Sequence, residues 1–381
     1  MKHVNRRGFL VNGSALAAAA AARTEMSAAR ADFPWAARQT YLNAATEHPL
    51  SVHSTRAIEE YLHALSHGPD SARDRFENGH LMAEVKRMFA RLINASPHEI
   101  GFTPSTQTGE NIVLEGLDIQ AGGGNVVTND LHYGGSLLNY AHRRKAGMDV
   151  RVVPHRDYQI DIRDLERVVD RKTKLIAIAL VSNVNGYVHD VKAISDLAHA
   201  HGAYLYCDVI QCAGAIPIDV KAMGIDFLAC SSYKFLMGGR FGYLYVREDL
   251  QGAVLRPRLF GGRSTPSGAS RYEISTASHI GCVCQHQALQ YIHALGVGRI
   301  AAHARPLIDR LRKELPAAGY PVITPETSHS PIVSFRLNNP EEARARLKAA
   351  NVIVTMGSYL RVSVSVFNNM ADVDRLIAAL A

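Results

Sequence analysis

One lysine, Lys234, has the sequence environment of a reactive amine. It follows a short apolar run and two serines, Ser231 and Ser232, and it precedes two glycines, Gly238 and Gly239. A lysine at the mouth of a buried strand loses charge by desolvation, because the protein interior disfavours the ammonium form. A neutral amine is what Schiff-base formation with an aldehyde requires. The stretch therefore predicts covalent amine chemistry at Lys234.

Three short apolar runs around this lysine have the length of buried β-strands. They are Tyr204–Cys207, Asp226–Cys230 and Gly242–Val246, and the carboxylate of Asp208 directly follows the first. Apolar runs and amphipathic segments alternate from residue 125 to residue 246, as in strands joined by crossover helices. The sequence therefore predicts an α/β fold with a mainly parallel sheet, whose strand ends carry the ligand.

The order of the motifs around Lys234 resembles that of one known family. Asp208-x-x-Gln211 is followed by Ser231-x-x-Lys234 and then by a glycine-rich turn into the run that ends at Val246. This pattern is similar to that of the class V pyridoxal-phosphate (PLP) enzymes, which include cysteine desulfurases, isopenicillin N epimerase-like proteins, kynureninases and several aminotransferases. The resemblance implies the PLP-dependent transferase fold of type I, with a seven-stranded sheet in a large domain and a smaller α+β domain at the C-terminus.

The resemblance also implies roles around the cofactor. Lys234 would hold PLP as a Schiff base, and Asp208 would pair with the pyridinium nitrogen. Gln211 would hydrogen-bond the ring oxygen, and His132 would stack on the ring. The other cofactor-binding residues that the family pattern implies are Thr106, Gln107, Asn183, Ser231 and Thr276.

A second segment has a physical reason to bind phosphate. Small hydroxyl residues of Thr103–Asn111 lead into an amphipathic helix, and a helix N-terminus offers free amide groups and a positive dipole end. By resemblance, Thr106 and Gln107 would hold the PLP phosphate, whereas simple helix capping by Ser105 or Thr106 would need no ligand. Thr276 would reach the phosphate of the neighbouring subunit, so the resemblance implies a homodimer with shared active sites.

The substrate side of the site rests on two further matches. Arg361 matches the family arginine that grips the substrate carboxylate, a bidentate task that suits a guanidinium. The segment from Phe33 to Leu50 resembles one that lies over the active site and would bring Ala45 near the substrate, with Asn183 beside it. Glu47 and His48 follow as candidates for specificity residues or for a solvated loop.

PLP permits several reactions, so the family leaves the reaction type open. We expect an amino-acid or peptide-like substrate that is changed at its amino group or α-carbon, and transamination or deamination is favoured. The alternatives are C–S lysis by β-elimination, isopenicillin N epimerase-like epimerisation, and a non-catalytic PLP-fold binding protein. Desulfurases carry a persulfide-forming cysteine in a loop where Thr355–Tyr359 has none, and Tyr233 stands where they have histidine. These departures argue against a desulfurase that uses a protein persulfide.

The N-terminus predicts export. Arg6 and Arg7 precede an alanine-rich run to Ala22, a pattern similar to a twin-arginine (Tat) signal peptide. The run is too short and too weakly apolar for a stable membrane span. Cleavage after Ala31 fits the small-x-small rule, and cleavage after Ala22 is a second candidate. We expect a periplasmic or otherwise exported enzyme, which is transported by the Tat machinery and is free of the membrane in its mature form. The alternative is that the segment is a cytoplasmic extension.

Composition limits the partners of the chain. Of the formal charge of +7 over 381 residues, residues 1–30 contribute +4, from five basic residues against one acidic, which leaves +3. Without a dense basic block, nucleic-acid binding has no support. The 18 histidines are scattered, and no metal site is predicted. Five cysteines, with no Cys-x-x-Cys pair, argue against a disulfide framework, and Cys282 and Cys284 are candidates for exposure.

These observations divide the chain into four parts. They are a signal peptide at 1–31, an N-terminal segment at 32–58, a large PLP-binding domain at 59–275 and a small domain at 276–381. In the last part, one helical segment precedes the final two strand patterns and another follows them. This order predicts its α+β character.

Overall fold

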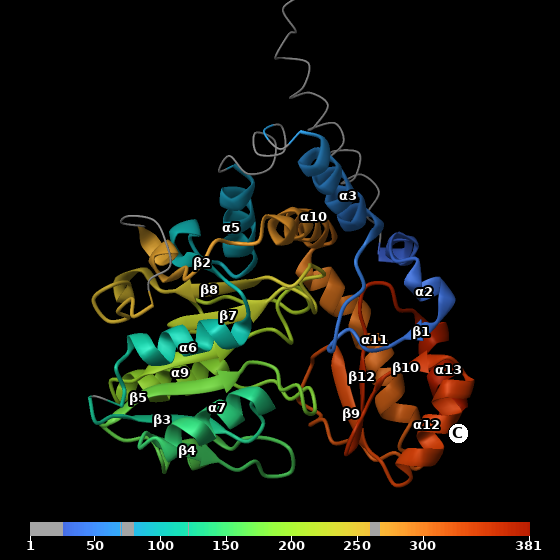
Figure 1. Ribbon diagram of the computed structural model, residues 1–381. Coiled ribbons are helices and arrows are strands. Elements are labelled where there is room, and N and C mark those ends of the chain that lie inside the picture. The colour runs from blue at the N-terminus through green and yellow to red at the C-terminus, as the bar shows by residue number, and fades with distance from the viewer. Residues whose placement is uncertain (1–25, 69, 71–79, 121, 260–266) are drawn as a thin grey trace, which may run out of the picture.

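A computed structural model of the chain describes residues 26–68, 70, 80–120, 122–259 and 267–381. The twin-arginine segment of the predicted leader lies outside the described residues. Figure 1 shows a large sheet covered by helices, with the C-terminal elements gathered beside it.

The large sheet has seven strands in the order β2-β8-β7-β6-β5-β3-β4. The strands are β2 (Ile100–Thr103), β3 (Asn125–Asn129), β4 (Asp149–Val153), β5 (Thr173–Ala179), β6 (Tyr204–Asp208), β7 (Phe227–Ser231) and β8 (Gly242–Val246). Strands β3 to β7 run parallel to their neighbours among themselves, whereas β8 is antiparallel to both β7 and β2. The prediction of a mainly parallel seven-stranded sheet is confirmed.

Both faces of this sheet are apolar, so its strands read as continuous apolar runs rather than alternating ones. Along β6, Leu205 and Cys207 belong to one buried cluster, and Tyr206 belongs to the other. The first cluster includes side chains of α5 (His80–Leu92), α9 (Val191–Ala200) and α10 (His279–Leu295). The second includes side chains of α6 (Thr106–Gly116) and α7 (Gly134–Lys145).

The C-terminal part is built on a three-stranded antiparallel sheet in the order β11-β12-β9, which confirms the predicted α+β character. Its elements are α11 (Val297–Glu314), β9 (Ile332–Arg336), α12 (Pro340–Ala349), β10 (Val352–Ile353), β11 (Thr355–Met356), β12 (Tyr359–Ser363) and α13 (Met370–Leu380). A third apolar cluster joins them. Strand β1 (Thr40–Tyr41) pairs in parallel with β10, so the segment that contains β1 is attached to this part.

The remaining helical elements connect these parts. They are η1 (Met26–Asp32), α2 (Trp35–Arg38), α3 (Val52–His67), η3 (Pro97–Glu99), α8 (Ile162–Glu166), η4 (Glu248–Leu250) and η5 (Gly268–Tyr272). Helix α10 begins five residues before the predicted start at Cys284, because the Ser278 side chain caps it by accepting a hydrogen bond from the Gly281 N–H. Among the described helices, none is both long and apolar enough to cross a bilayer.

The segment before β1 is anchored to the C-terminal helix. Arg30 donates from Nη1 to Oδ2 of Asp372 and to the carbonyl of Phe367, each at 2.7 Å. Ala29 beside it is fully buried. These contacts join η1 to the start of α13 across more than 300 residues of sequence.

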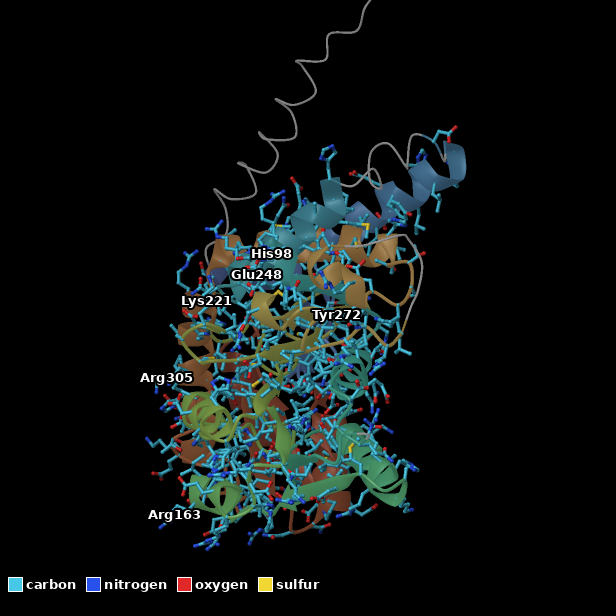
Figure 2. The ribbon with its side chains drawn as sticks, turned by 90° about the vertical axis from the view of Figure 1, so that its left-hand side faces the viewer. His98, Arg163, Lys221, Glu248, Tyr272 and Arg305 are labelled. Atoms are coloured by element: carbon cyan, nitrogen blue, oxygen red, sulfur yellow. The ribbon has the colours of Figure 1, made fainter. Side chains whose placement is uncertain are left out.

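Figure 2 shows Arg163, Lys221 and Arg305 projecting from the outside of the molecule. A cavity of about 760 Å³ lies between α11 and the segment that precedes β9, with Arg305 in its lining. None of the residues that the sequence predicts for the site lines this cavity.

Candidate active site

Most of the predicted site residues meet at the carboxyl edge of the parallel strands. Asp208 ends β6, Lys234 follows β7, Asn183 follows β5, and His132 follows β3. Thr106 opens α6, which packs over β7. Ligands of open parallel sheets bind at this edge, because strand ends and helix N-termini converge there.

Lys234 is a buried amine with a depressed pKa. Its side chain is almost enclosed, with 7% of the residue exposed. Burial lowers the pKa of the amine to about 8; the nearby Asp208 charge raises it, and the Arg361 charge lowers it further. An amine in this state is neutral more often than a surface lysine, which is what a nucleophile requires.

Asp208 is a buried carboxylate at the end of β6. Its Oδ1 accepts a hydrogen bond from the Ile210 N–H at 2.9 Å. Burial raises the pKa of Asp208 to about 6, whereas the charges of His132 and Lys234 and the Ile210 bond lower it. At neutral pH the group is therefore an anion in an apolar setting, suited to pair with a protonated heterocyclic nitrogen.

His132 is buried beside Asp208. Its Nδ1 accepts the Tyr133 N–H at 2.7 Å. Its Nε2 has no hydrogen-bond partner within the described ranges. Burial lowers the pKa of His132 to about 4, so the ring is a neutral aromatic surface at neutral pH.

The predicted phosphate segment is tied to the end of β7 by two reciprocal bonds. The Thr106 N–H donates to Ser231 Oγ, and the Ser231 N–H donates to Thr106 Oγ1, both at 2.8 Å. Ser105 caps α6 by accepting the Thr108 N–H at 3.2 Å. The Gln107 side chain instead donates to the carbonyl of Gly135 at 3.0 Å. The phosphate roles of Thr106, Gln107 and Ser231 remain predictions.

The substrate side is organised by Arg361, which is 6% exposed. Its Nη1 donates to the backbone carbonyl of Asn183 at 2.7 Å. Its Nη2 donates to the hydroxyls of Thr46 at 2.8 Å and Thr355 at 2.9 Å. Burial lowers the pKa of Arg361. A buried cation between hydroxyl groups is suited to exchange them for a carboxylate.

Ala45 and Gln211 lie against each other at the same edge. Gln211 Nε2 donates to the Ala45 carbonyl at 3.2 Å, and the Ala45 N–H donates to Ser363 Oγ at 2.9 Å. Of their neighbours, His48 is not part of a solvated loop. It is 3% exposed, and its Nε2 is 2.7 Å from Ser365 Oγ. Glu47 is exposed and pairs with Arg240 at 3.3 Å.

Four of the predicted residues keep a buried polar atom without a hydrogen-bond partner in the described part of the chain. These atoms are His132 Nε2, Asn183 Oδ1, Gln211 Oε1 and Arg361 Nε. Buried polar groups are normally paired, so unpaired groups that converge on one edge indicate a polar ligand. Together with the amine of Lys234 and the carboxylate of Asp208, they fit PLP and an amino-acid substrate.

Thr276 is the predicted residue that the fold does not bring into this pocket. It lies just before α10 and is exposed to solvent. Its predicted role in the site of a neighbouring subunit remains a prediction.

Two polar groups at the site were missed by the sequence reasoning. Thr355 hydroxyl binds Arg361, and the carboxylate of Glu110 lies 3.7 Å from Nε2 of His132. An acidic residue inside the apolar face of α6 is a signal that could have identified Glu110, because such residues are seldom buried without a partner. No sequence pattern marks Thr355.

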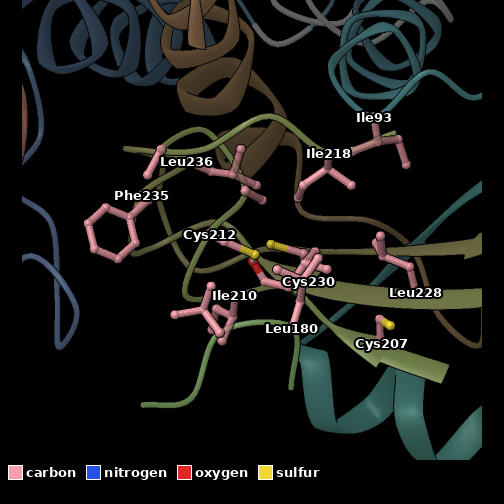
Figure 3. Close-up of a cluster of buried hydrophobic side chains, with 14 of the residues drawn as sticks. Ile93, Leu180, Cys207, Ile210, Cys212, Ile218, Leu228, Cys230, Phe235 and Leu236 are labelled. Atoms are coloured by element: carbon pink, nitrogen blue, oxygen red, sulfur yellow. Dashed lines mark hydrogen bonds between the residues drawn. The ribbon is translucent and has the colours of Figure 1, made fainter. Parts of the chain in front are cut away.

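All five cysteines are buried as free thiols, which corrects the expectation that Cys282 or Cys284 is exposed. Cys282 lies in the large apolar core, whereas Cys284 lies against Gly239, whose N–H donates to its Sγ at 3.2 Å. Figure 3 shows Cys212 and Cys230 close together among Leu180, Ile210 and other apolar side chains. Burial raises the pKa of all five thiols, so they are poor nucleophiles.

Similarity to known proteins agrees with this geometry. Residues 40–376 match the family model of the class-V aminotransferases. A probable cysteine desulfurase from Methanothermobacter thermautotrophicus is 30% identical over 327 residues, which cover 81% of each chain. The relatives named as cysteine desulfurases favour cleavage of a C–S bond over the transamination that the sequence alone favoured.

Solved structures share the fold. The cysteine desulfurase CsdA from Escherichia coli superposes with a TM-score of 0.83 at 21% identity, over 93% of this chain and 97% of that one. The cystine C–S lyase C-DES, in complex with its reaction product cysteine persulfide, gives a TM-score of 0.80 at 22% identity, over 91% and 98%. Fold, site geometry and family match agree, and the chain belongs to the class-V aminotransferase family of PLP-dependent enzymes.

Proposed function

We propose that this enzyme is a C–S lyase that acts on cystine or a similar sulfur-containing amino acid and releases the sulfur in a small molecule. The carrying observation is the burial of all five thiols, among them Cys230, whose pKa burial raises although the nearby Lys234 charge lowers it. A desulfurase that stores sulfur on the protein needs an accessible thiolate. The relatives named as cysteine desulfurases and as a cystine C–S lyase support the substrate class.

Three residues of the chain have separate roles in the proposed reaction. Bound PLP supplies an electron sink for the negative charge that develops at the substrate α-carbon. Lys234, with its pKa of about 8, takes the α-proton. Asp208 holds a proton on the cofactor nitrogen, and Arg361 binds the substrate carboxylate by exchanging the hydroxyls of Thr46 and Thr355.

The proposed reaction on cystine balances with water alone. Loss of the α-proton is followed by cleavage of the β-carbon–sulfur bond, and the leaving cysteine persulfide takes both electrons of that bond. The remaining three-carbon fragment takes up one water and yields pyruvate and ammonia. No external oxidant or reductant is needed.

The test compares products from the PLP-loaded full chain supplied with L-cystine. We expect pyruvate, ammonia and sulfane sulfur in equal amounts, no added sulfur atom in the intact protein mass, and no product from Lys234→Ala. A sulfur-containing keto acid together with conversion of the cofactor to its amine form would instead indicate transamination. D-cystine as the sole product would indicate epimerisation.

We propose separately that the enzyme is exported and that its signal peptide is cleaved after Ala22. The twin arginines support export, and the Arg30–Asp372 contact supports the cleavage site, because cleavage after Ala31 would remove Arg30. An oxidising compartment, in which small thiols persist as disulfides, suits a cystine substrate. N-terminal sequencing of the exported protein tests the site, and a start at Asp32 would refute it.

We also propose a homodimer in which Thr276 completes the neighbouring site. The exposed position of Thr276 supports this assignment. Light scattering of the purified chain tests the dimer. Mixed dimers of one Thr276→Val subunit and one Lys234→Ala subunit test the sharing, because a complete site then needs Lys234 from one subunit and Thr276 from the other. Activity no higher than that of the two variant homodimers would refute the shared site.

A further inference from the structure

A buried carboxyl group, that of Glu110, lies beside His132 and has no role in the proposed mechanism. It is in α6, one turn after Thr106, and is 1% exposed. Burial of an acidic group is costly unless it makes specific hydrogen bonds. An apolar residue would fill the same place in this helix at lower cost, so the carboxylate needs an explanation.

Both oxygens of Glu110 accept hydrogen bonds from α7. Ser136 Oγ donates to Oε2 at 2.5 Å, and the Tyr140 hydroxyl donates to Oε1 at 2.7 Å. These bonds fix the plane of the carboxylate. A carboxylate accepts about four hydrogen bonds, so Oε1 retains acceptor capacity. That oxygen faces Nε2 of His132 at 3.7 Å.

The protonation pattern of His132 fits this arrangement. Nδ1 accepts the Tyr133 N–H, so a neutral ring carries its proton on Nε2. Nε2 is buried and has no hydrogen-bond partner among the described residues. A movement of about 0.8 Å would bring Nε2–H and Oε1 to an ordinary hydrogen-bond distance of about 2.9 Å.

We propose that Glu110 is a positioning residue for His132: it holds the Nε2–H edge of the imidazole, while the Tyr133 N–H holds the Nδ1 edge. Both edges are then engaged, and the flat face of the ring is what remains to stack on a planar ligand. His132 is thereby a fixed stacking surface rather than a proton donor or acceptor. The kinetic consequence rests on the proposed function, but the hydrogen bond is a property of the chain alone.

The test reads the imidazole signals of His132 by NMR in the full chain without cofactor, using histidine labelled with ¹⁵N and His132→Asn for assignment. We expect the Nε2–H tautomer, with a downfield proton that exchanges slowly with water. Glu110→Met should move this proton upfield and speed its exchange, and Glu110→Gln, which retains an acceptor oxygen, should restore part of the effect.

The double variant Ser136→Ala/Tyr140→Phe is the matched control. It loses the same two hydrogen bonds but keeps the carboxylate, so the Nε2–H signal should change less than in Glu110→Met. An unchanged signal in Glu110→Met, or an equal loss in the control, would overturn the inference.

A second measurement separates this inference from the proposed function. In the PLP-loaded enzyme, Glu110→Met should lower kcat/KM about fivefold, the loss of one net hydrogen bond. Absence of C–S lyase activity in the parent would refute the proposed function and leave the NMR result standing. C–S lyase activity in the parent, together with an Nε2–H signal that is unchanged in Glu110→Met, would refute the positioning role and leave the proposed function intact.

Discussion

The titration of Lys234 is the most direct test of the electrostatics of the site. Burial lowers its pKa from 10.5 to about 8. At pH 7 a group with the lower pKa is about 9% neutral, against about 0.03% for an ordinary lysine, a gain of about 300-fold in the reactive form. The structure therefore predicts that the reactivity of Lys234 in the cofactor-free chain rises about tenfold per pH unit up to pH 8 and levels above it.

Two substitutions should shift this titration in opposite directions. Asp208 stabilises the ammonium form, so Asp208→Asn should lower the midpoint below 8. Arg361 destabilises it, so Arg361→Gln should raise the midpoint. Arg240→Gln is the control, because this exposed cation pairs with Glu47 and is not among the groups that shift the pKa of Lys234.

The assay is competitive acetylation of the full chain across pH 6–11, with the extent at each lysine read by peptide mass spectrometry. Labelling of the exposed Lys221 corrects for the reactivity of the reagent. A midpoint near 10.5 in the parent would refute the desolvation argument. Shifts in the same direction for Asp208→Asn and Arg361→Gln would refute the assignment of the two charges as neighbours of the amine.

Three further predictions concern substrate binding and stability. Arg361→Lys loses bidentate geometry and should raise KM about tenfold with a smaller change in kcat; a loss confined to kcat would contradict this role in steady-state kinetics. Burial lowers the pKa of His48 to about 4, so between pH 6.5 and pH 4 the unfolded chain binds a proton that the folded chain does not. The free energy of unfolding should therefore fall as the pH falls, by up to about 1.4 kcal/mol per pH unit from this group. Urea titrations should show a shallower fall for His48→Gln, whereas the exposed control His63→Gln should match the parent. Gly186 has φ +75°, and an added Cβ would collide with the Ile332 carbonyl, so Gly186→Ala should lower the free energy of unfolding by about 2 kcal/mol. Gly319 has φ +89° and open space around it, so the control Gly319→Ala should lower it by about 1 kcal/mol. Equal losses of stability in the two variants would exclude the collision.

The sequence alone determined the elements and the chemical centre of this enzyme. Apolar runs of strand length and helical spacing are local patterns, and they indicate where β6 and β7 lie and that both faces of the sheet are covered. Asp208 and Lys234 each stand at the end of such a run, so the parallel topology brings them to one edge without further information. The order of these motifs was enough to indicate the family and PLP.

Only the tertiary structure decided which distant side chains share a contact. Arg361 meets the Asn183 carbonyl across 178 residues, and Arg30 meets Asp372 across 342. Likewise, the carboxylate of Glu110 lies 3.7 Å from His132 Nε2 because α6 is bonded to α7, which begins just after His132. Cys284 is buried because α10 packs against the turn after Lys234, where the Gly239 N–H donates to its Sγ. Such contacts depend on the packing of whole elements, and no local period in the sequence carries that information.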